Sequence, residues 1–151
     1  MKPSALLTES RVVLGIGGAA SKEKVLRRLL EVAFRGVPGD FDGVLRDVLD
    51  REASMTTGIG FGVAIPHAHS AHVRSSTAAL GISEKGLDWD AVDGEPVHIV
   101  FACVMPDGDP GGYVRTLADI AALLGREDVR KAIVAAPGPR EVLDIVKANE
   151  R

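Results

Sequence analysis

The fold is decided by one stretch of the 151-residue chain, Val97-His-Ile-Val-Phe-Ala-Cys-Val-Met105. The stretch is almost continuously apolar and rich in β-branched side chains, which is typical of a strand buried on both faces of a sheet. Residues 76–82 form a second run of the same kind. Both runs therefore predict a sheet that is covered by helices.

Apolar residues recur at helical spacing on both sides of these strands. They predict helices at residues 22–33, with Ser21 as the N-cap, and at 41–51, 113–124, 128–135 and 140–148. Residues 12–16 are expected to form a short strand or an extended entry to the domain. Because helices and strands alternate, we predict an α/β fold. It would be a single domain over residues 1–151, with a mixed β-sheet of about five strands flanked by helices on both faces.

The composition argues against two classes of protein, nucleic-acid-binding proteins and membrane-inserted proteins. The net charge is -3 and the pI is about 5.8, which argues against a nucleic-acid-binding protein. No stretch reaches the roughly 18 apolar residues of a membrane span, so direct membrane insertion is not expected. The single cysteine, Cys103, lies in an apolar run and is expected to be a buried structural residue. These features favour a cytoplasmic protein.

The chemistry is expected in a glycine-rich segment, Thr57-Gly-Ile-Gly-Phe-Gly-Val-Ala-Ile-Pro-His67. Pro66 has no N–H group and a fixed φ angle, so it should end a strand and hold His67 at the rim of a sheet. The glycines remove side chains from the approach to this histidine and allow unusual backbone angles. A histidine beside a glycine-rich turn is also often an ordinary surface residue, so these residues alone leave its role open.

Phosphoryl transfer is one reaction that these residues could perform. A neutral imidazole is a good nucleophile near neutral pH. The guanidinium group of Arg51 could bind two phosphoryl oxygens at once, and the hydroxyls of Thr56 and Thr57 could donate further hydrogen bonds. No metal ion or other cofactor is required.

The segment 57–67 resembles the phosphorylation-site signature of enzyme IIA of the fructose/mannitol type, a component of the bacterial phosphoenolpyruvate-dependent sugar phosphotransferase system. The run matches that signature throughout, and residues 87–97 resemble the loop and strand that follow the site. The resemblance extends over about residues 7–147, almost the whole chain.

The resemblance implies a role for particular residues. The phosphorylated histidine falls on His67, the site arginine on Arg51, and the place of a second family histidine on Tyr113. A tyrosine can donate a hydrogen bond but cannot carry an imidazolium charge. Gly60 and Phe61, within the glycine run, join Thr56 and Thr57 as expected contact residues. Phe61 could instead pack into the core.

The resemblance also implies partners. The donor would be the phosphocarrier HPr, and the acceptor the IIB domain of a sugar permease, phosphorylated on cysteine. An alternative is a nitrogen-type regulatory IIA, in which the phosphorylation state of His67 controls binding to a target protein. A degenerate domain that only binds partners is a further possibility.

The histidines at positions 67, 69 and 72 allow a different interpretation, in which they form a metal-binding site. Residues two apart on an extended segment face the same way, and zinc accepts two or three imidazoles. A metal site would therefore need His69 and His72 as much as His67. The simpler interpretation is that His69 and His72 lie in a polar loop, and that His98 has a structural role.

Overall fold

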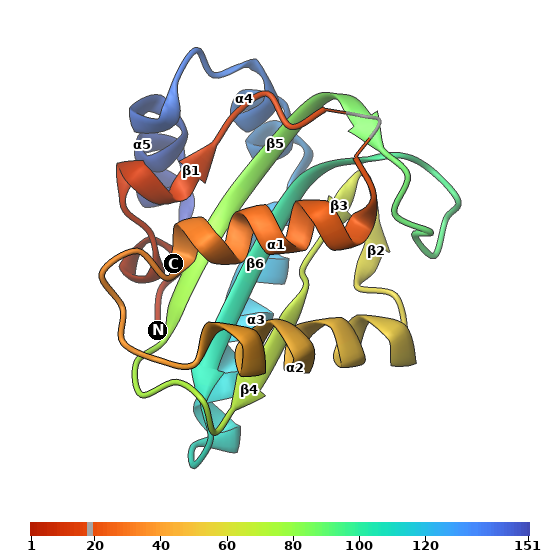
Figure 1. Ribbon diagram of the computed structural model, residues 1–151. Helices are drawn as coiled ribbons and strands as arrows, with labels where there is room; N and C mark the ends of the chain where they lie inside the picture. The colour runs from red at the N-terminus through yellow and green to blue at the C-terminus, as the bar shows by residue number, and fades with distance from the viewer. Residues whose placement is uncertain (18–19) are drawn as a thin grey trace.

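The computed structural model describes residues 1–17 and 20–151, and it confirms the α/β fold (Figure 1). Within these residues, six strands form one mixed sheet in the order β1-β5-β6-β3-β2, and β4 also pairs with β6. Their bounds are β1 Val12–Val13, β2 Gly58–Gly60, β3 Val63–Ala64, β4 His67–Ser70, β5 Thr77–Leu87 and β6 Val97–Pro106.

The two strands predicted from apolar runs form the centre of the sheet. β5 and β6 are antiparallel, with Thr77 opposite Val104 and Ile82 opposite Ile99. β5 continues beyond the predicted end at residue 82, because an irregularity in the pairing carries the strand on to Leu87. By contrast, the strand expected at residues 12–16 is only two residues long.

Two short strands lie along the other edge of β6. β3 and β4 both run parallel to β6, with Val63 opposite Ile99 and His67 opposite Cys103. Because β5 occupies the first edge of β6, β3 and β4 share the second edge and follow one another along it. The prediction that His69 lies in a loop is therefore wrong. Pro66 interrupts the strand, and the chain resumes pairing at His67.

Helices cover both faces of the sheet (Figure 1). α1 (Lys22–Ala33) and α2 (Phe41–Ser54) lie on the front face in this view, and α3 (Pro110–Leu124), α4 (Glu127–Ala135) and α5 (Pro139–Asn149) lie behind the sheet. The N-terminal 3-10 turns, Pro3–Leu6 and Glu9–Arg11, contact α5. No helix among the described residues is long and apolar enough to cross a bilayer.

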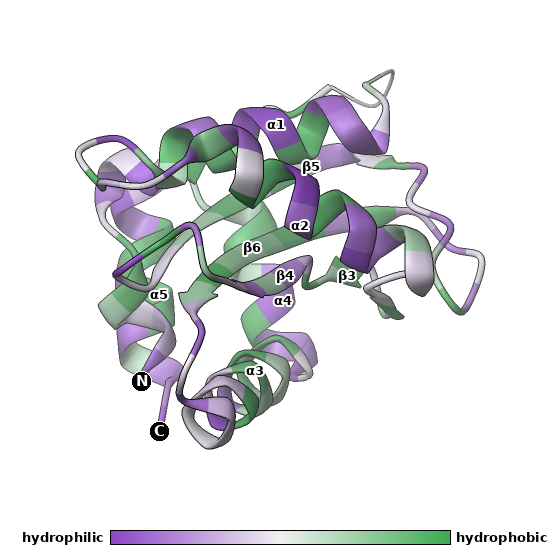
Figure 2. Cartoon of the chain, turned by 60° about the horizontal axis from the view of Figure 1, so that its bottom comes forward, coloured by the Kyte–Doolittle hydropathy of each residue, from purple (hydrophilic) through white to green (hydrophobic). Residues whose placement is uncertain are grey.

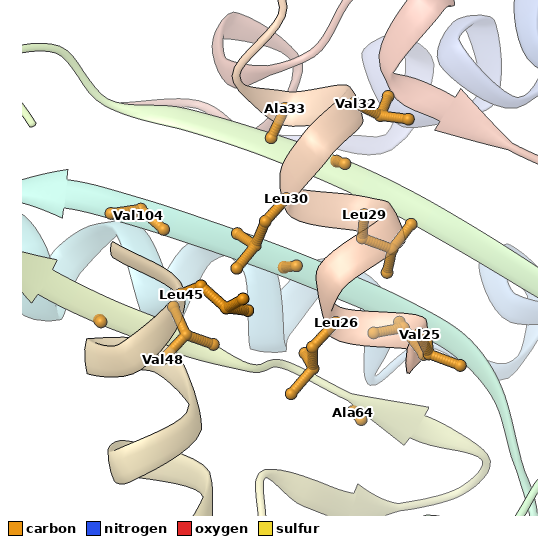
Figure 3. Packing of buried hydrophobic residues seen from close by; sticks show 14 of the residues in the cluster. Val25, Leu26, Leu29, Leu30, Val32, Ala33, Leu45, Val48, Ala64 and Val104 are labelled. Atoms are coloured by element: carbon orange, nitrogen blue, oxygen red, sulfur yellow. The ribbon is translucent and has the colours of Figure 1, made fainter. Parts of the chain in front are cut away.

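Each face has its own apolar cluster. On the α1/α2 side, Leu26, Leu29 and Leu30 are fully buried and point toward the sheet (Figure 3). Gly81 permits this close packing, because a Cβ atom there would lie 2.4 Å from Ile16 Cδ1 and 2.9 Å from Leu29 Cδ2. Figure 2 shows the resulting pattern, in which apolar strands are enclosed by helices whose polar sides face outward.

Side-chain caps set the starts of three helices. Ser21 caps α1 as predicted, by accepting from the backbone N–H of Lys24. Asp40 and Asp109 cap α2 and α3 in the same way. α3 begins at Pro110, before the predicted start at residue 113, because proline fits the first turn of a helix and Asp109 provides the cap.

Candidate active site

A cleft of about 580 Å³ opens where β4, the C-terminal half of α2 and the first turn of α3 meet. α2 packs against β4, which brings the two elements together although they are separated in the sequence (Figure 1). The charged, imidazole and aromatic side chains that line the cleft are Asp47, Asp50, Arg51, His67, His69, His72, Asp107 and Tyr113. The structure therefore brings together His67, Arg51 and Tyr113, the three principal residues predicted from the sequence.

His67 is the first residue of β4 and is partly buried. Its Nδ1 atom lies 2.6 Å from the carbonyl oxygen of Ile65. Since a carbonyl can only accept, Nδ1 carries the proton and donates it. In the neutral ring, Nε2 therefore holds the free electron pair.

The surroundings keep this ring neutral. Burial has the largest effect and lowers the pKa of His67 below its ordinary value of 6.5, although the hydrogen bond to Ile65 acts in the opposite direction. The positive charge of Arg51 and the neighbouring His69 lower the pKa further, while the charge of Glu52 raises it. His67 is thus a neutral nucleophile at physiological pH.

Arg51 lies in the last turn of α2, where a positive charge interacts favourably with the helix dipole. Its Nη1 atom donates to the carbonyl oxygen of Met55 at 3.0 Å. Asp47, Asp50 and Arg51 are three and four residues apart, so they share one face of the helix and line the cleft. The guanidinium group lies close enough to His67 to affect its pKa.

Tyr113 lies in the first turn of α3, and its ring contacts two imidazoles. The ring centroids are 5.8 Å apart for His67 and 5.2 Å apart for His69, and the second pair is edge-to-face. Burial raises the pKa of Tyr113 to about 12. The side chain is therefore a neutral phenol that can donate a hydrogen bond.

Thr56 and Thr57 lie near the cleft, but their hydroxyls have other partners. The Thr57 side chain is buried and donates to the carboxylate of Glu52, while Thr56 donates to the carbonyl oxygen of Trp89 at 3.4 Å. Neither belongs to the cleft wall among the described residues. Their predicted contact with a phosphoryl group stays a prediction that would require these hydrogen bonds to be exchanged.

Gly60 and Phe61 lie at the opposite end of β6 from the cleft. They form the turn between β2 and β3, in which Gly60, Phe61 and Gly62 have φ angles of 98°, 59° and 79°. The β6 partners of Val63 and His67 are four residues apart, which corresponds to about 13 Å along the strand. The Phe61 ring is 74% exposed, so it does not pack into the core.

The three neighbouring histidines are held by different partners. His67 binds Ile65, His69 Nδ1 lies 2.6 Å from Asp107, and His72 Nδ1 lies 3.5 Å from Asp40. In the part of the chain that the structure describes, no three His, Cys, Asp or Glu side chains are arranged to hold a metal ion. This geometry gives the metal-site interpretation no support.

Two remaining predictions about individual residues are confirmed. Cys103 is fully buried, and burial raises the pKa of its thiol to about 12. His98 donates from Nδ1 to the carbonyl oxygen of Ser83 at 2.9 Å, as expected for a structural histidine.

Two acidic residues of the site were missed. Asp107 reaches His69 because β4 and β6 end side by side. Glu52, the residue after Arg51, is buried and binds Thr57 and Lys22. The register of a parallel strand pair is not visible in the sequence. For Glu52, a signal was present, since a charged residue next to the predicted site arginine is a candidate for a buried supporting role.

A family model described as "Phosphoenolpyruvate-dependent sugar phosphotransferase system, EIIA 2" matches residues 5–149. The chain belongs to this family. It is therefore an EIIA protein of the phosphotransferase system, a class of phosphotransfer components.

Similar proteins include both transport and regulatory EIIA proteins. The chain is 34% identical to the fructose-specific EIIA component of Haloferax volcanii, with 84% of this chain and 83% of that protein covered. It is 32% identical to the nitrogen regulatory protein of Pseudomonas aeruginosa, with 93% and 92% covered. The fructose-specific EIIABC component of Bacillus subtilis is 33% identical over 100% of this chain, which spans only 24% of that protein.

Solved EIIA structures have the same fold. The nitrogen regulatory protein IIA-Ntr of Neisseria meningitidis superposes with a TM-score of 0.87 at 26% identity, covering 95% of this chain and 97% of that one. The mannitol IIA of Escherichia coli, in its complex with phosphorylated IIB, gives a TM-score of 0.79 at 18% identity, covering 94% and 97%. At that identity the second match shows the shared fold.

Proposed function

We propose that this EIIA protein is a phosphoryl carrier, in which Nε2 of His67 accepts a phosphoryl group from phospho-HPr and passes it to a IIB domain in the cytoplasm. The observation that carries the proposal is the 2.6 Å hydrogen bond from Nδ1 to the Ile65 carbonyl oxygen. This bond assigns the proton to Nδ1 and the nucleophilic electron pair to Nε2.

The transfer step requires no proton movement at His67. The Nε2 electron pair attacks the phosphorus atom, the bond between phosphorus and the donor histidine of HPr breaks, and its electrons remain on that nitrogen. The role of the protein is to position the reactants and to stabilise charge on the phosphoryl oxygens. Arg51 is the residue suited to that role, because its guanidinium group offers several N–H donors in a plane.

The second step returns the phosphoryl group to a protein acceptor. A cysteine thiolate of IIB attacks the phosphorus, the bond to Nε2 breaks, and His67 returns to its neutral form. The complex of mannitol IIA with phosphorylated IIB supports this direction for a protein of the same fold.

A regulatory role is the second candidate. It is supported by the 32% identity to a nitrogen regulatory protein and by the fit to the IIA-Ntr structure. A phosphoryl group adds a charge of about -1.5 to -2 beside the cleft, by analogy with phosphorylated hydroxyls, which would change the affinity for a charged target surface.

The proposal is tested by incubating the protein with phosphoenolpyruvate, enzyme I and HPr, without added metal. Mass spectrometry should detect an acid-labile adduct of about 80 Da. We expect the adduct to be absent from His67→Ala and present in His72→Ala, a matched histidine variant. Failure to phosphorylate the wild-type protein with HPr from the same organism would contradict the proposal. Subsequent transfer to IIB would distinguish the carrier from the regulatory role.

A further inference from the structure

His67 is accompanied on its strand by a second histidine that faces the same way. Along β4, Ala68 and Ser70 are buried, while His67 and His69 alternate with them. Residues two apart on a strand project to the same side of a sheet. His69 accordingly lines the same cleft as His67.

Tyr113 links the two imidazoles. Its ring is packed against His67 and meets His69 edge-to-face at 5.2 Å. A half-buried aromatic ring on the first turn of α3 thus fixes the positions of both histidines relative to each other. Because Tyr113 remains a neutral phenol, it supplies no positive charge to the cleft.

Asp107 sets the orientation of the His69 ring. The His69 Nδ1 atom lies 2.6 Å from Asp107 Oδ1, and a carboxylate accepts, so Nδ1 donates. The described residues give the His69 Nε2 atom no hydrogen-bond partner. The two side chains are 64% and 51% exposed. A hydrogen-bonded pair this exposed contributes little to stability, and it is accessible to a group that enters the cleft.

The charges of the cleft leave a phosphoryl group short of positive partners. Asp47, Asp50 and Asp107 are carboxylates. Among the described residues that line the cleft, Arg51 carries the only permanent positive charge. A phosphoryl dianion attached to His67 would therefore be stabilised by a second cation that lies on its own side of the sheet.

We propose that His69, oriented by Asp107 and packed against Tyr113, is that second cation and donates its Nε2–H to the phosphoryl group on His67. This inference rests on the proposed function. In the neutral His69 ring the proton sits on Nδ1, so Nε2 must take up a proton from solvent when the phosphoryl group arrives. The resulting imidazolium donates to Asp107 on one side and to a phosphoryl oxygen on the other. No covalent bond to His69 forms.

The experiment measures the rate of phosphorylation by phospho-HPr in three variants, with thermal unfolding recorded for each. His69→Ala should lower the rate about tenfold, the effect of losing one charge-assisted hydrogen bond. His69→Lys should restore most of the rate, because it returns a cationic donor. Arg46→Ala, which removes an exposed positive charge from α2 outside the cleft wall, should be unaffected.

A measurement on the wild-type protein avoids any dependence on the folding of variants. Nitrogen NMR of the histidine rings at one fixed pH, before and after phosphorylation, should show a phosphoryl-dependent change at Nε2 of His69, while the ring nitrogens of His98, at the far end of β6, stay unchanged. A wild-type rate in His69→Ala, or unchanged His69 ring nitrogens in the phosphorylated protein, would overturn the inference alone. If wild-type His67 is not phosphorylated at all, the proposed function fails, and the inference falls with it.

Discussion

The carboxylate of Glu52 accepts a hydrogen bond from the backbone N–H of Thr57 at 2.8 Å. Glu52 is 6% exposed and also accepts from the Thr57 hydroxyl and from Lys22 Nζ, the latter at 3.2 Å. One buried side chain thus connects the last turn of α2 to the entry of β2 and to α1. Arg51 is the residue immediately before Glu52 in the same helical turn.

Replacing Glu52 with leucine should destabilise the fold. The buried Thr57 N–H and hydroxyl would lose their acceptor, which costs about 2 kcal/mol in the free energy of unfolding. Glu52→Gln keeps one acceptor oxygen and should cost less. Denaturant unfolding measures both, and equal stability of Glu52→Leu and the wild type would show that these hydrogen bonds contribute nothing.

Arg51→Ala should lower the rate of His67 phosphorylation about 100-fold, the typical effect of removing a donor that stabilises transition-state charge. Arg51→Lys should recover only part of this loss, because an ammonium group lacks the planar pair of donors. Arg46→Ala is a matched control, since Arg46 is exposed on the same helix and outside the cleft wall. Stopped-flow rates with phospho-HPr make the comparison, and full activity in Arg51→Lys would argue against bidentate binding.

The pH dependence of phosphorylation should reflect the lowered pKa of His67. Burial is the main cause of that lowering, so the folded ring stays neutral below pH 6.5, where an exposed histidine would begin to protonate. In His69→Ala, where the second cleft histidine no longer contributes, the rate of phosphorylation should be constant above pH 6.5 and fall only at lower pH, once a proton competes for Nε2 of His67. A decline that already begins above pH 6.5 would contradict this expectation.

The same shift makes stability depend on pH with a definite sign. The folded pKa lies below the unfolded value, so the unfolded chain binds more protons in the window between them. The contribution of His67 is therefore fully present above pH 6.5 and is lost as the pH falls toward the folded pKa. Comparison of wild type with His67→Gln over this window measures it, and parallel stability curves would exclude the shift.

The turn at Phe61 carries backbone strain that can be measured. Its φ angle of 59° is unfavourable for most residues, whereas asparagine tolerates this region. Phe61→Ala and Phe61→Asn both remove the contact of Arg130 with the ring, which lies 5.2 Å away. We expect Phe61→Asn to be more stable than Phe61→Ala by about 1 kcal/mol. Equal unfolding free energies would show that the turn is unstrained.

The central features of the fold could be predicted because they depend on local patterns. The apolar runs gave β6 and the first part of β5, and Ser21 marked the start of α1 correctly. His67 and Arg51 could be named as site candidates because a long ordered motif surrounds the histidine. Apolar runs, capping residues and helical periodicity are each recognisable within a short stretch of chain, so a single sequence is enough to predict the elements that they specify.

The segment 58–73 could not be predicted because its structure depends on a distant strand. β4 exists only because residues 67–70 pair with residues 103–106, and that register also brings Asp107 to His69. The glycine run was expected to open the approach to His67 and to allow unusual backbone angles. The second expectation is confirmed, because Gly60 and Gly62 have positive φ angles, but they lie in the β2–β3 turn away from the cleft.

The central claim is that Nε2 of His67 is the atom that carries the phosphoryl group, and nitrogen NMR of the phosphorylated protein tests it most directly. The protein is labelled with ¹⁵N at histidine, phosphorylated with phosphoenolpyruvate, enzyme I and HPr, and compared with the unphosphorylated form. The account predicts phosphorus coupling at Nε2 of His67, with Nδ1 still protonated. Coupling at Nδ1, or at any other histidine, would contradict it.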